Sequence, residues 1–305
     1  QRSLVGSEMC IRDRVRGIEK FKEFFAGYED NYVIIGGTAC EVHEEIYAQN
    51  PRATKDIDII LIVEALSSDF VAKFWEFVKV AGYVSRNKGT GEGEQRHEYY
   101  RFKEPSAPEF PYQVELFSRN PGLVNFPEDA HITPVPVDED LSSLSAILMD
   151  DDYYNFTIAH SRLEYGVHIA NIESLICLKC KAYLEMLGRK DNGEQVDSRH
   201  IAKHRKDVFR PVAMLAPTGT YMVPDTLKKD VDDFCEVVKE ELPNADFFKS
   251  AGVRGGTEEQ SLKQLESTFM LLPVMAVYLN ITIILVIITI CVLYITICVN
   301  YGLNL

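Results

Sequence analysis

The sequence predicts an α/β fold in its first half and a mainly helical region after it. Up to about Asn171, short apolar runs of the length of buried strands alternate with amphipathic helical segments, and only helical periodicity follows. The chain has 305 residues, of which 46% are hydrophobic, so it can build an ordinary core. This composition excludes a disordered, collagen-like or small disulfide-rich protein.

The elements of the first half follow from the spacing of apolar residues. Phe70, Phe74 and Phe77 recur at helical spacing within residues 69–80, whereas residues 32–35 form a short apolar run that stops at two glycines. In chain order we expect a helix at 18–28, a strand at 32–35, a helix at 38–48, a strand at 57–63, a helix at 69–80, strands at 98–102 and 112–117, and strand-like segments at 156–159 and 163–169.

The second half has the spacing of helices. They are expected at residues 172–187, closed by Gly188, at 195–209, and at 225–241 ahead of Pro243. The expected division of the chain is a foreign segment at 1–14, an α/β domain at 15–170, a helical domain at 171–270 and an apolar tail at 271–305.

Both ends of the chain differ from the middle. Residues 1–14 have no periodicity and resemble a peptide that recurs when sequencing-adapter DNA is translated, so we leave them out of the fold as an artefact. Residues 281–299 are almost wholly apolar and long enough to span a membrane, yet they are rich in Ile, Val and Thr. Three interpretations remain: a C-terminal membrane anchor, an out-of-frame tail, or a buried strand or helix.

Charge and cysteine usage restrict the partners and the compartment. The formal net charge is −14, which argues against a broad nucleic-acid footprint but allows a small anionic ligand held through a metal. The seven cysteines are scattered, so we expect reduced thiols in a cytoplasmic protein. Cys177 and Cys180 form a CxxC within a helical pattern, with no second pair for a zinc site, and we interpret them as packing residues.

Two acids at the start of a predicted strand are the strongest chemical signal. Asp56 and Asp58 flank Ile57, and alternate residues of a strand point to the same side, so both carboxylates project together. Two carboxylates on one side repel each other unless a cation bridges them, and their oxygens suit Mg²⁺. Glu115, the acid of the 112–117 strand, joins them as a third carboxylate if the two strands pair.

A glycine turn upstream suits a phosphate. The strand at 32–35 runs through Gly36, Gly37 and Thr38 into a helix, whose first turn offers unpaired N–H groups and a positive dipole end. Acids and a phosphate-binding turn together fit metal-dependent attack on the α-phosphate of a nucleoside triphosphate.

Two segments carry a family resemblance. Residues 33–39 (VIIGGTA) and 52–58 (RATKDID) resemble the nucleotidyltransferase superfamily, specifically its AbiEii/AbiGii-type toxin branch. The resemblance extends over about residues 18–209. It implies a mixed-sheet nucleotidyltransferase core and, as activity, transfer of a nucleoside monophosphate from an NTP such as ATP or GTP to an RNA or protein acceptor.

The resemblance also implies roles for individual residues. Asp56 and Asp58, with Glu115 in the place of the third acid, would be catalytic and would hold Mg²⁺ or Mn²⁺. The triphosphate would lie on Gly36, Gly37 and Thr38, with Arg52 and Thr54 of the second motif beside them.

Two helical residues also match the branch. Lys179 lies on the apolar stripe of its helix, so it needs a partner, for which a triphosphate is suitable; alternatively its stem packs and its head reaches water. Asp197 shares a face with Ile201 and resembles the family's last acidic motif, in which it would orient Lys179 or act as a base. His200 stands near the place of that motif's second aspartate.

The helix at 195–209 allows two further interpretations. His200 and His204 are four residues apart and could bind a metal, but Arg199, Lys203 and the neighbouring bases favour a solvated basic face. The same face is the one local patch suited to an RNA acceptor.

Three functional hypotheses follow. The first is a Mg²⁺-dependent nucleotidyltransferase with a tRNA-like RNA or a protein as acceptor, acting as the toxin of a bacterial toxin–antitoxin or abortive-infection pair with its antitoxin encoded nearby. The second is a non-catalytic nucleotide-binding or interaction module. The third is a membrane-tethered protein that depends on residues 279–299.

Overall fold

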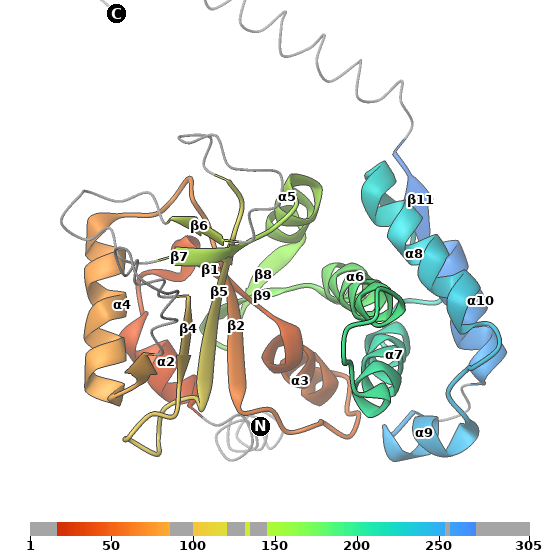
Figure 1. The fold of residues 1–305 in the computed structure, drawn as a ribbon, viewed down its shortest axis with the longest axis horizontal. Helices are drawn as coiled ribbons and strands as arrows, with labels where there is room; N and C mark the ends of the chain where they lie inside the picture. Colours follow the sequence, from red (N-terminus) through yellow and green to blue (C-terminus); the bar gives the residue numbers. More distant parts are fainter. Residues whose placement is uncertain (1–16, 86–99, 121–131, 135–144, 254–256, 273–305) are drawn as a thin grey trace, which may run out of the picture.

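The computed structural model describes residues 17–85, 100–120, 132–134, 145–253 and 257–272. They form a nine-stranded mixed sheet with helices on both faces, beside a group of helices from the C-terminal half (Figure 1). The predicted fold class, an α/β core followed by a mainly helical region, is confirmed.

The bounds of the elements are as follows. In chain order the helices are α2 (Ile18–Phe24), the 3₁₀ turn η1 (Glu29–Asn31), α3 (Gly36–Ile46), α4 (Ser68–Ala81), α5 (Asp151–Ala159), α6 (Ile172–Asp191), α7 (Ser198–Val212), α8 (Asp225–Val238), α9 (Ala245–Ser250) and α10 (Glu258–Thr268). The strands are β1 (Tyr32–Ile35), β2 (Asp56–Leu61), β3 (Val84–Ser85), β4 (Arg101–Lys103), β5 (Gln113–Ser118), β6 (Ile132–Pro134), β7 (Ser145–Leu148), β8 (Ser161–Glu164), β9 (Val167–Ala170), β10 (Tyr221–Val223) and β11 (Phe269–Leu271).

The order of the sheet places the predicted site strands next to one another. It runs β3-β4-β5-β2-β1-β9-β8, with β6 and β7 attached through β5. β2 is antiparallel to β1, with Asp58 opposite Ile35, and parallel to β5, with Asp58 opposite Glu115. The glycine turn after β1 and the acids of β2 and β5 therefore lie at neighbouring positions of the sheet.

One face of the sheet is covered by α2 and α4 through an aromatic core (Figure 1). The Phe77 ring lies 5.3 Å from that of Phe25 and 5.1 Å from that of Phe110, measured between centroids. All three side chains are buried. Packed aromatic rings remove large apolar areas from water, so this layer fixes the sheet from behind the site.

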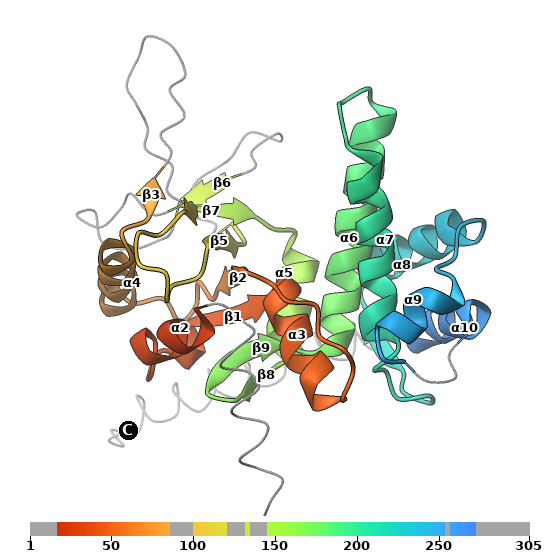
Figure 2. The ribbon, with the colours of Figure 1, turned by 90° about the horizontal axis from the view of Figure 1, so that it is seen from below.

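The helical region packs on the other side. α3 separates the sheet from α6 and α7, which lie side by side as a hairpin (Figure 2). A second buried core joins α6, α7, α8 and α10. α5 belongs to both cores, because Tyr154 packs with the sheet while Tyr153 and Phe156 pack with the helices. α6 begins at Ile172, as the sequence predicts, but it continues through Gly188 to Asp191, so Gly188 does not end the helix.

Two predicted strands are corrected. The segment 156–159 is the end of helix α5, which begins because the Asp150 carboxylate accepts hydrogen bonds from the amides of Asp152 and Tyr153. The segment 163–169 is a hairpin rather than one strand, since Tyr165 and Gly166 turn the chain with φ of 50° and 79°. No element was predicted at η1, β3, β6, β7, α9, α10, β10 or β11.

The segments that were interpreted at the two ends of the chain lie outside the described residues. Residues 1–14 and 281–299 both fall there, as do the first two residues of the strand predicted at 98–102. Within the ranges that the structure describes, no helix is both long and apolar enough to cross a membrane.

Candidate active site

Three carboxylates come together on neighbouring strands. Asp56 and Asp58 alternate along β2, and the parallel pairing with β5 puts Glu115 directly opposite Asp58. Because alternate strand residues point to one side, the three side chains share a face of the sheet. The condition that the sequence left open, the pairing of these two strands, is met.

Burial and the neighbouring acids change the protonation of Asp58. Burial, followed by the charges of Glu115 and Asp56, raises the pKa of Asp58 to about 7, while Lys179 and Arg101 act in the opposite direction. Asp58 thus faces two further acids and two cations within one small volume. A carboxyl in such surroundings ionises readily at neutral pH only when a positive charge lies close to it.

The glycine turn directly adjoins Asp58. α3 begins at Gly36, so both glycines belong to its first turn rather than to a loop before residue 38, and no side chain caps that turn. Gly36 has a φ of +67°, and a Cβ there would lie 2.2 Å from Oδ2 of Asp58. Only a glycine allows the carboxylate to approach the helix N-terminus this closely.

The two threonines of the motifs support the backbone. Thr38 is buried, and its hydroxyl donates to the carbonyl oxygen of Asp56 over 2.7 Å. The Thr54 hydroxyl lies 3.1 Å from the position that a Cβ on Gly37 would occupy. The Thr38 hydroxyl therefore joins α3 to β2 by a hydrogen bond. The resemblance implied that Thr38 would bind the triphosphate instead.

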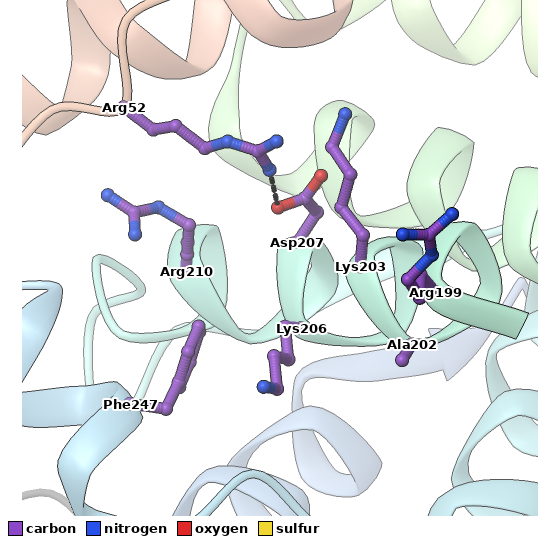
Figure 3. Close-up of a pocket in the computed structure, with 8 residues that line it drawn as sticks. All are labelled: Arg52, Arg199, Ala202, Lys203, Lys206, Asp207, Arg210 and Phe247. Carbon is purple, nitrogen blue, oxygen red and sulfur yellow. Dashed lines mark hydrogen bonds and ion pairs between the residues drawn. The ribbon is translucent and has the colours of Figure 1, made fainter.

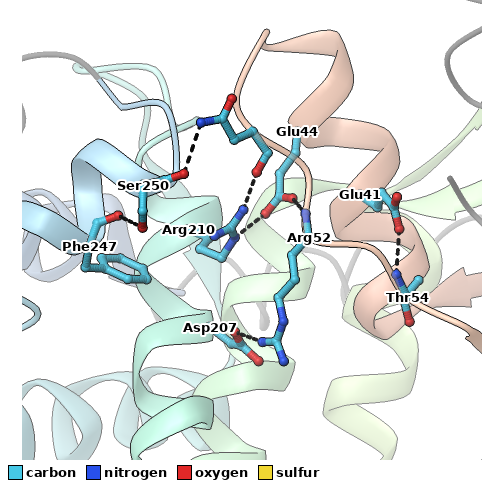
Figure 4. Close-up of polar contacts among 9 residues, drawn as sticks. Glu41, Glu44, Arg52, Thr54, Asp207, Arg210, Phe247 and Ser250 are labelled. Atoms are coloured by element: carbon cyan, nitrogen blue, oxygen red, sulfur yellow. Dashed lines mark hydrogen bonds and ion pairs between the residues drawn. The ribbon is translucent and has the colours of Figure 1, made fainter.

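Two buried glutamates of α3 shape the loop before β2 (Figure 4). The amide of Thr54 donates to Oε2 of Glu41, and the amide of Arg52 donates to Oε2 of Glu44, each over 2.9 Å. The other oxygen of Glu44 accepts a hydrogen bond of 2.6 Å from Nε of Arg210 on α7. The loop that carries the second motif is thus fixed from both sides.

Lys179 lies at the junction of α3, α6 and α7. Burial lowers the pKa of its ammonium, but Cys40, Asp207 and Glu44 outweigh this, so that the net shift is upward. Burial in turn raises the pKa of the Cys40 thiol, which keeps its proton at neutral pH. The charges that hold Lys179 protonated there are therefore those of Asp207 and Glu44, and the ammonium also interacts with Asp58.

Asp197 does not take the position that the sequence predicted for it. α7 begins at Ser198 rather than at 195, so Asp197 is the N-cap and its exposed carboxylate accepts from the amide and guanidinium of Arg199. The acid of α7 that does interact with Lys179 is Asp207, which also accepts a hydrogen bond of 2.6 Å from Arg52. Asp207 lies ten residues beyond Asp197, about three helical turns further along the chain.

Arg52 lines a basic cavity of about 390 Å³ beside α7 (Figure 3). Five cationic side chains and one carboxylate surround it. The lining residues are Arg52, Arg199, Ala202, Lys203, Lys206, Asp207, Arg210 and Phe247. Lys203 and Lys206 form no ion pair within the described part of the chain, whereas Arg52 and Arg210 are both paired.

The fit to a divalent cation depends on two acids. Asp56 and Asp58 offer hard oxygen ligands. Burial, followed by the charges of Glu115 and Asp56, raises the pKa of Asp58, and a bound cation would offset both effects. Glu115 is instead paired with Arg101 of β4. Among the described residues no group of three or more His, Cys, Asp or Glu side chains is arranged to hold a metal, and His200 and His204 form none.

Comparisons with known proteins return no match to a family model, to a curated protein or to a solved structure. The functional assignment therefore rests on the residues of this chain and their arrangement.

Sequence reasoning missed four residues of this site. They are Glu41, Glu44, Asp207 and Arg210. A usable signal existed for Asp207, which is the one acid on a helix with five Lys or Arg residues. Glu41 and Glu44 are three apart on a helix whose other face is apolar, which indicates two acids on a common side.

The raised pKa of Asp58 predicts a pH-dependent stability. Its folded pKa of about 7 exceeds the ordinary value of 3.8, so the folded state binds the proton more tightly and stability falls as pH rises between these values. With divalent cations chelated, we expect the free energy of unfolding of Asp58→Asn at pH 8, measured by urea denaturation, to exceed that of the wild type by up to about 4 kcal/mol. This difference should vanish near pH 4. Asp30→Asn, at an exposed acid, serves as the control, and parallel pH curves for wild type and Asp58→Asn would contradict the prediction.

The Glu44–Arg210 pair predicts a large loss on breaking it. Its side chains are only 2% and 12% exposed. Arg210→Met should lower the free energy of unfolding by about 3–5 kcal/mol, because it leaves a buried carboxylate without its cation. Adding Glu44→Gln should restore much of that loss. The control is Arg199→Met, which breaks the exposed pair with Asp197 and should cost less than about 1 kcal/mol. Equal losses of the two Met variants in urea denaturation would contradict the prediction.

Proposed function

We propose that this protein is a metal-dependent nucleotidyltransferase that moves a nucleoside monophosphate from an NTP to an acceptor. The observation that carries the proposal is the contact of the Asp58 carboxylate with Gly36 at the start of α3, with Asp56 and Glu115 on the same face. It joins a carboxylate pair that suits Mg²⁺ to a helix N-terminus that suits a phosphate.

Each group has a role in this proposal. Asp56 and Asp58 would hold Mg²⁺ or Mn²⁺, which supplies charge neutralisation and Lewis-acid activation for phosphoryl transfer. The N–H groups of Gly36 and Gly37 would bind the triphosphate, and Lys179 would add a positive charge beside Asp58. Asp207 keeps Lys179 protonated, and it takes the role that Asp197 was expected to have.

The basic cavity supports RNA rather than protein as acceptor. Its five cationic side chains contrast with the net charge of −14, and Arg52 connects it to the loop before β2. A polyanionic acceptor would be drawn to this basic cavity despite the acidic net charge of the protein. As the toxin of a toxin–antitoxin pair, the protein would act in the cytoplasm, where Cys40, Cys177, Cys180 and Cys235 stay free thiols.

One observation favours the second candidate, a nucleotide-binding module without catalysis. Glu115 is paired with Arg101 and Arg52 with Asp207, so two groups of the expected site already have partners inside the protein. Such a module would bind NTP and release it unchanged.

A transfer assay tests the proposal. The full chain, with Mg²⁺ and each NTP labelled at the α-phosphate, should label total RNA, and label at the γ-phosphate should not be transferred. Asp58→Asn should reduce the transfer at least about 100-fold, because one of the two proposed cation ligands is lost. Asp30→Asn should behave as wild type.

The outcomes separate the candidates. Binding of NTP with no transfer to RNA or to lysate protein would establish the non-catalytic module. Transfer that survives in Asp58→Asn would remove the catalytic claim, and transfer to protein alone would reassign the acceptor. A toxin should also arrest bacterial growth on induction, and Asp58→Asn should not.

The cavity makes a separate prediction about the acceptor. Lys203→Glu with Lys206→Glu should weaken RNA binding at least about tenfold in filter binding and should lower the slope of its salt dependence by about 2. NTP binding should stay unchanged. The matched control is Lys229→Glu with Lys239→Glu, which reverses two exposed lysines of α8 and its C-cap that do not line the cavity. An equal loss in the control would show that net charge, not the cavity, governs binding.

A further inference from the structure

Glu115 lies between a carboxylate and a guanidinium on adjacent strands. The parallel pairing of β2 and β5 puts Asp58 opposite Glu115, and the antiparallel pairing of β4 and β5 puts Arg101 opposite the same residue. The carboxylate of Glu115 forms its ion pair with Arg101. The three side chains thus form a row across the sheet in the order Asp58, Glu115, Arg101.

The exposure of the pair shows which member is accessible. The Glu115 side chain is 13% exposed, whereas that of Arg101 is 43% exposed, with its guanidinium 5.8 Å from the Tyr100 ring centroid. Arg101 also interacts favourably with the charged form of Asp58. One cation therefore acts on two of the three acids, and it enters the cluster from the solvent side.

We propose that Arg101 is a positioning residue that keeps Glu115 out of the cation site. This inference rests on the proposed function, since the cation is the one that function requires. With Glu115 neutralised by Arg101, the site holds a divalent cation through Asp56 and Asp58 and binds the free ion weakly. The metal then enters mainly as its complex with the triphosphate, whose oxygens complete the ligands.

The electrostatics lead to an unusual expectation for substitutions. Removal of a cationic side chain normally weakens a binding site for a phosphate-bearing ligand. Here the loss of Arg101 releases Glu115 and removes a positive charge close to Asp58, so the affinity for a free divalent cation should increase. Arg101→Lys keeps the charge and should leave that affinity near its wild-type value.

Manganese binding in the absence of nucleotide tests this without any measure of activity. The full chain is titrated with Mn²⁺ at pH 7.5, and the free ion is counted by its EPR signal. We expect the Mn²⁺ affinity of Glu115→Gln and of Arg101→Lys to stay within about threefold of wild type. Arg101→Ala should bind Mn²⁺ at least about tenfold more tightly than wild type, and Asp58→Asn at least about tenfold more weakly. Arg101→Ala with Glu115→Gln should return to the wild-type value. Glu115→Gln preserves the shape of the side chain, and thermal melting checks that each variant is folded.

Three results would overturn the inference. They are a loss in Glu115→Gln as large as in Asp58→Asn, an unchanged or weaker affinity in Arg101→Ala, and no Mn²⁺ binding by either wild type or Arg101→Ala. The transfer assay separates this failure from that of the proposed function. If label transfer depends on Asp58 while the Mn²⁺ pattern fails, only the role of Arg101 is lost; if the Mn²⁺ pattern holds without transfer, the cation site stands and the transferase is refuted.

Discussion

The arrangement of the site depends on one buried carboxylate, that of Glu44. One of its oxygens accepts the amide of Arg52 and the other accepts the guanidinium of Arg210, so a single side chain of α3 joins the loop before β2 to helix α7. Arg210 also donates to the carbonyl oxygen of Asn50, at the start of the same loop. A carboxylate this deeply buried is tolerated only when paired and hydrogen-bonded, and here both conditions are met by groups that belong to the site.

A second constraint is the balance of charge around Asp58. Three acids converge from β2 and β5, and two cations, Lys179 and Arg101, reach them from different elements. Like charges at this spacing cannot all ionise unless positive groups are near. The helical region therefore contributes directly to the site. Helix α6 supplies Lys179, and helix α7 supplies Asp207, the acid that keeps Lys179 protonated.

What the sequence could predict was set by the range of the interactions. Strand alternation is local, so the common side of Asp56 and Asp58 could be derived, and the place of Glu115 followed once β2 and β5 pair. The start of α7 was misjudged by three residues, which moved Asp197 from a helix face to a cap. The partners of Arg52 and Arg210 lie 155 and 166 residues away in the chain, and no local pattern encodes such contacts. The segment 156–159 shows the same limit, because its apolar residues suit a strand as well as the helix that Asp150 starts.

Asp207 makes the basic cavity and the carboxylate site one electrostatic unit. It lines the cavity, accepts a hydrogen bond from Arg52 and stabilises the charge on Lys179, which in turn acts on Asp58. An anion in the cavity would compete with Asp207 for Arg52. The Asp207 carboxylate, once released from Arg52, would interact more strongly with Lys179. Linked equilibria are reciprocal. A change in the interaction between Lys179 and Asp207 would therefore also change the affinity of the cavity for an anion. The two sites lie on different elements, and the interactions of Asp207 and Lys179 connect them.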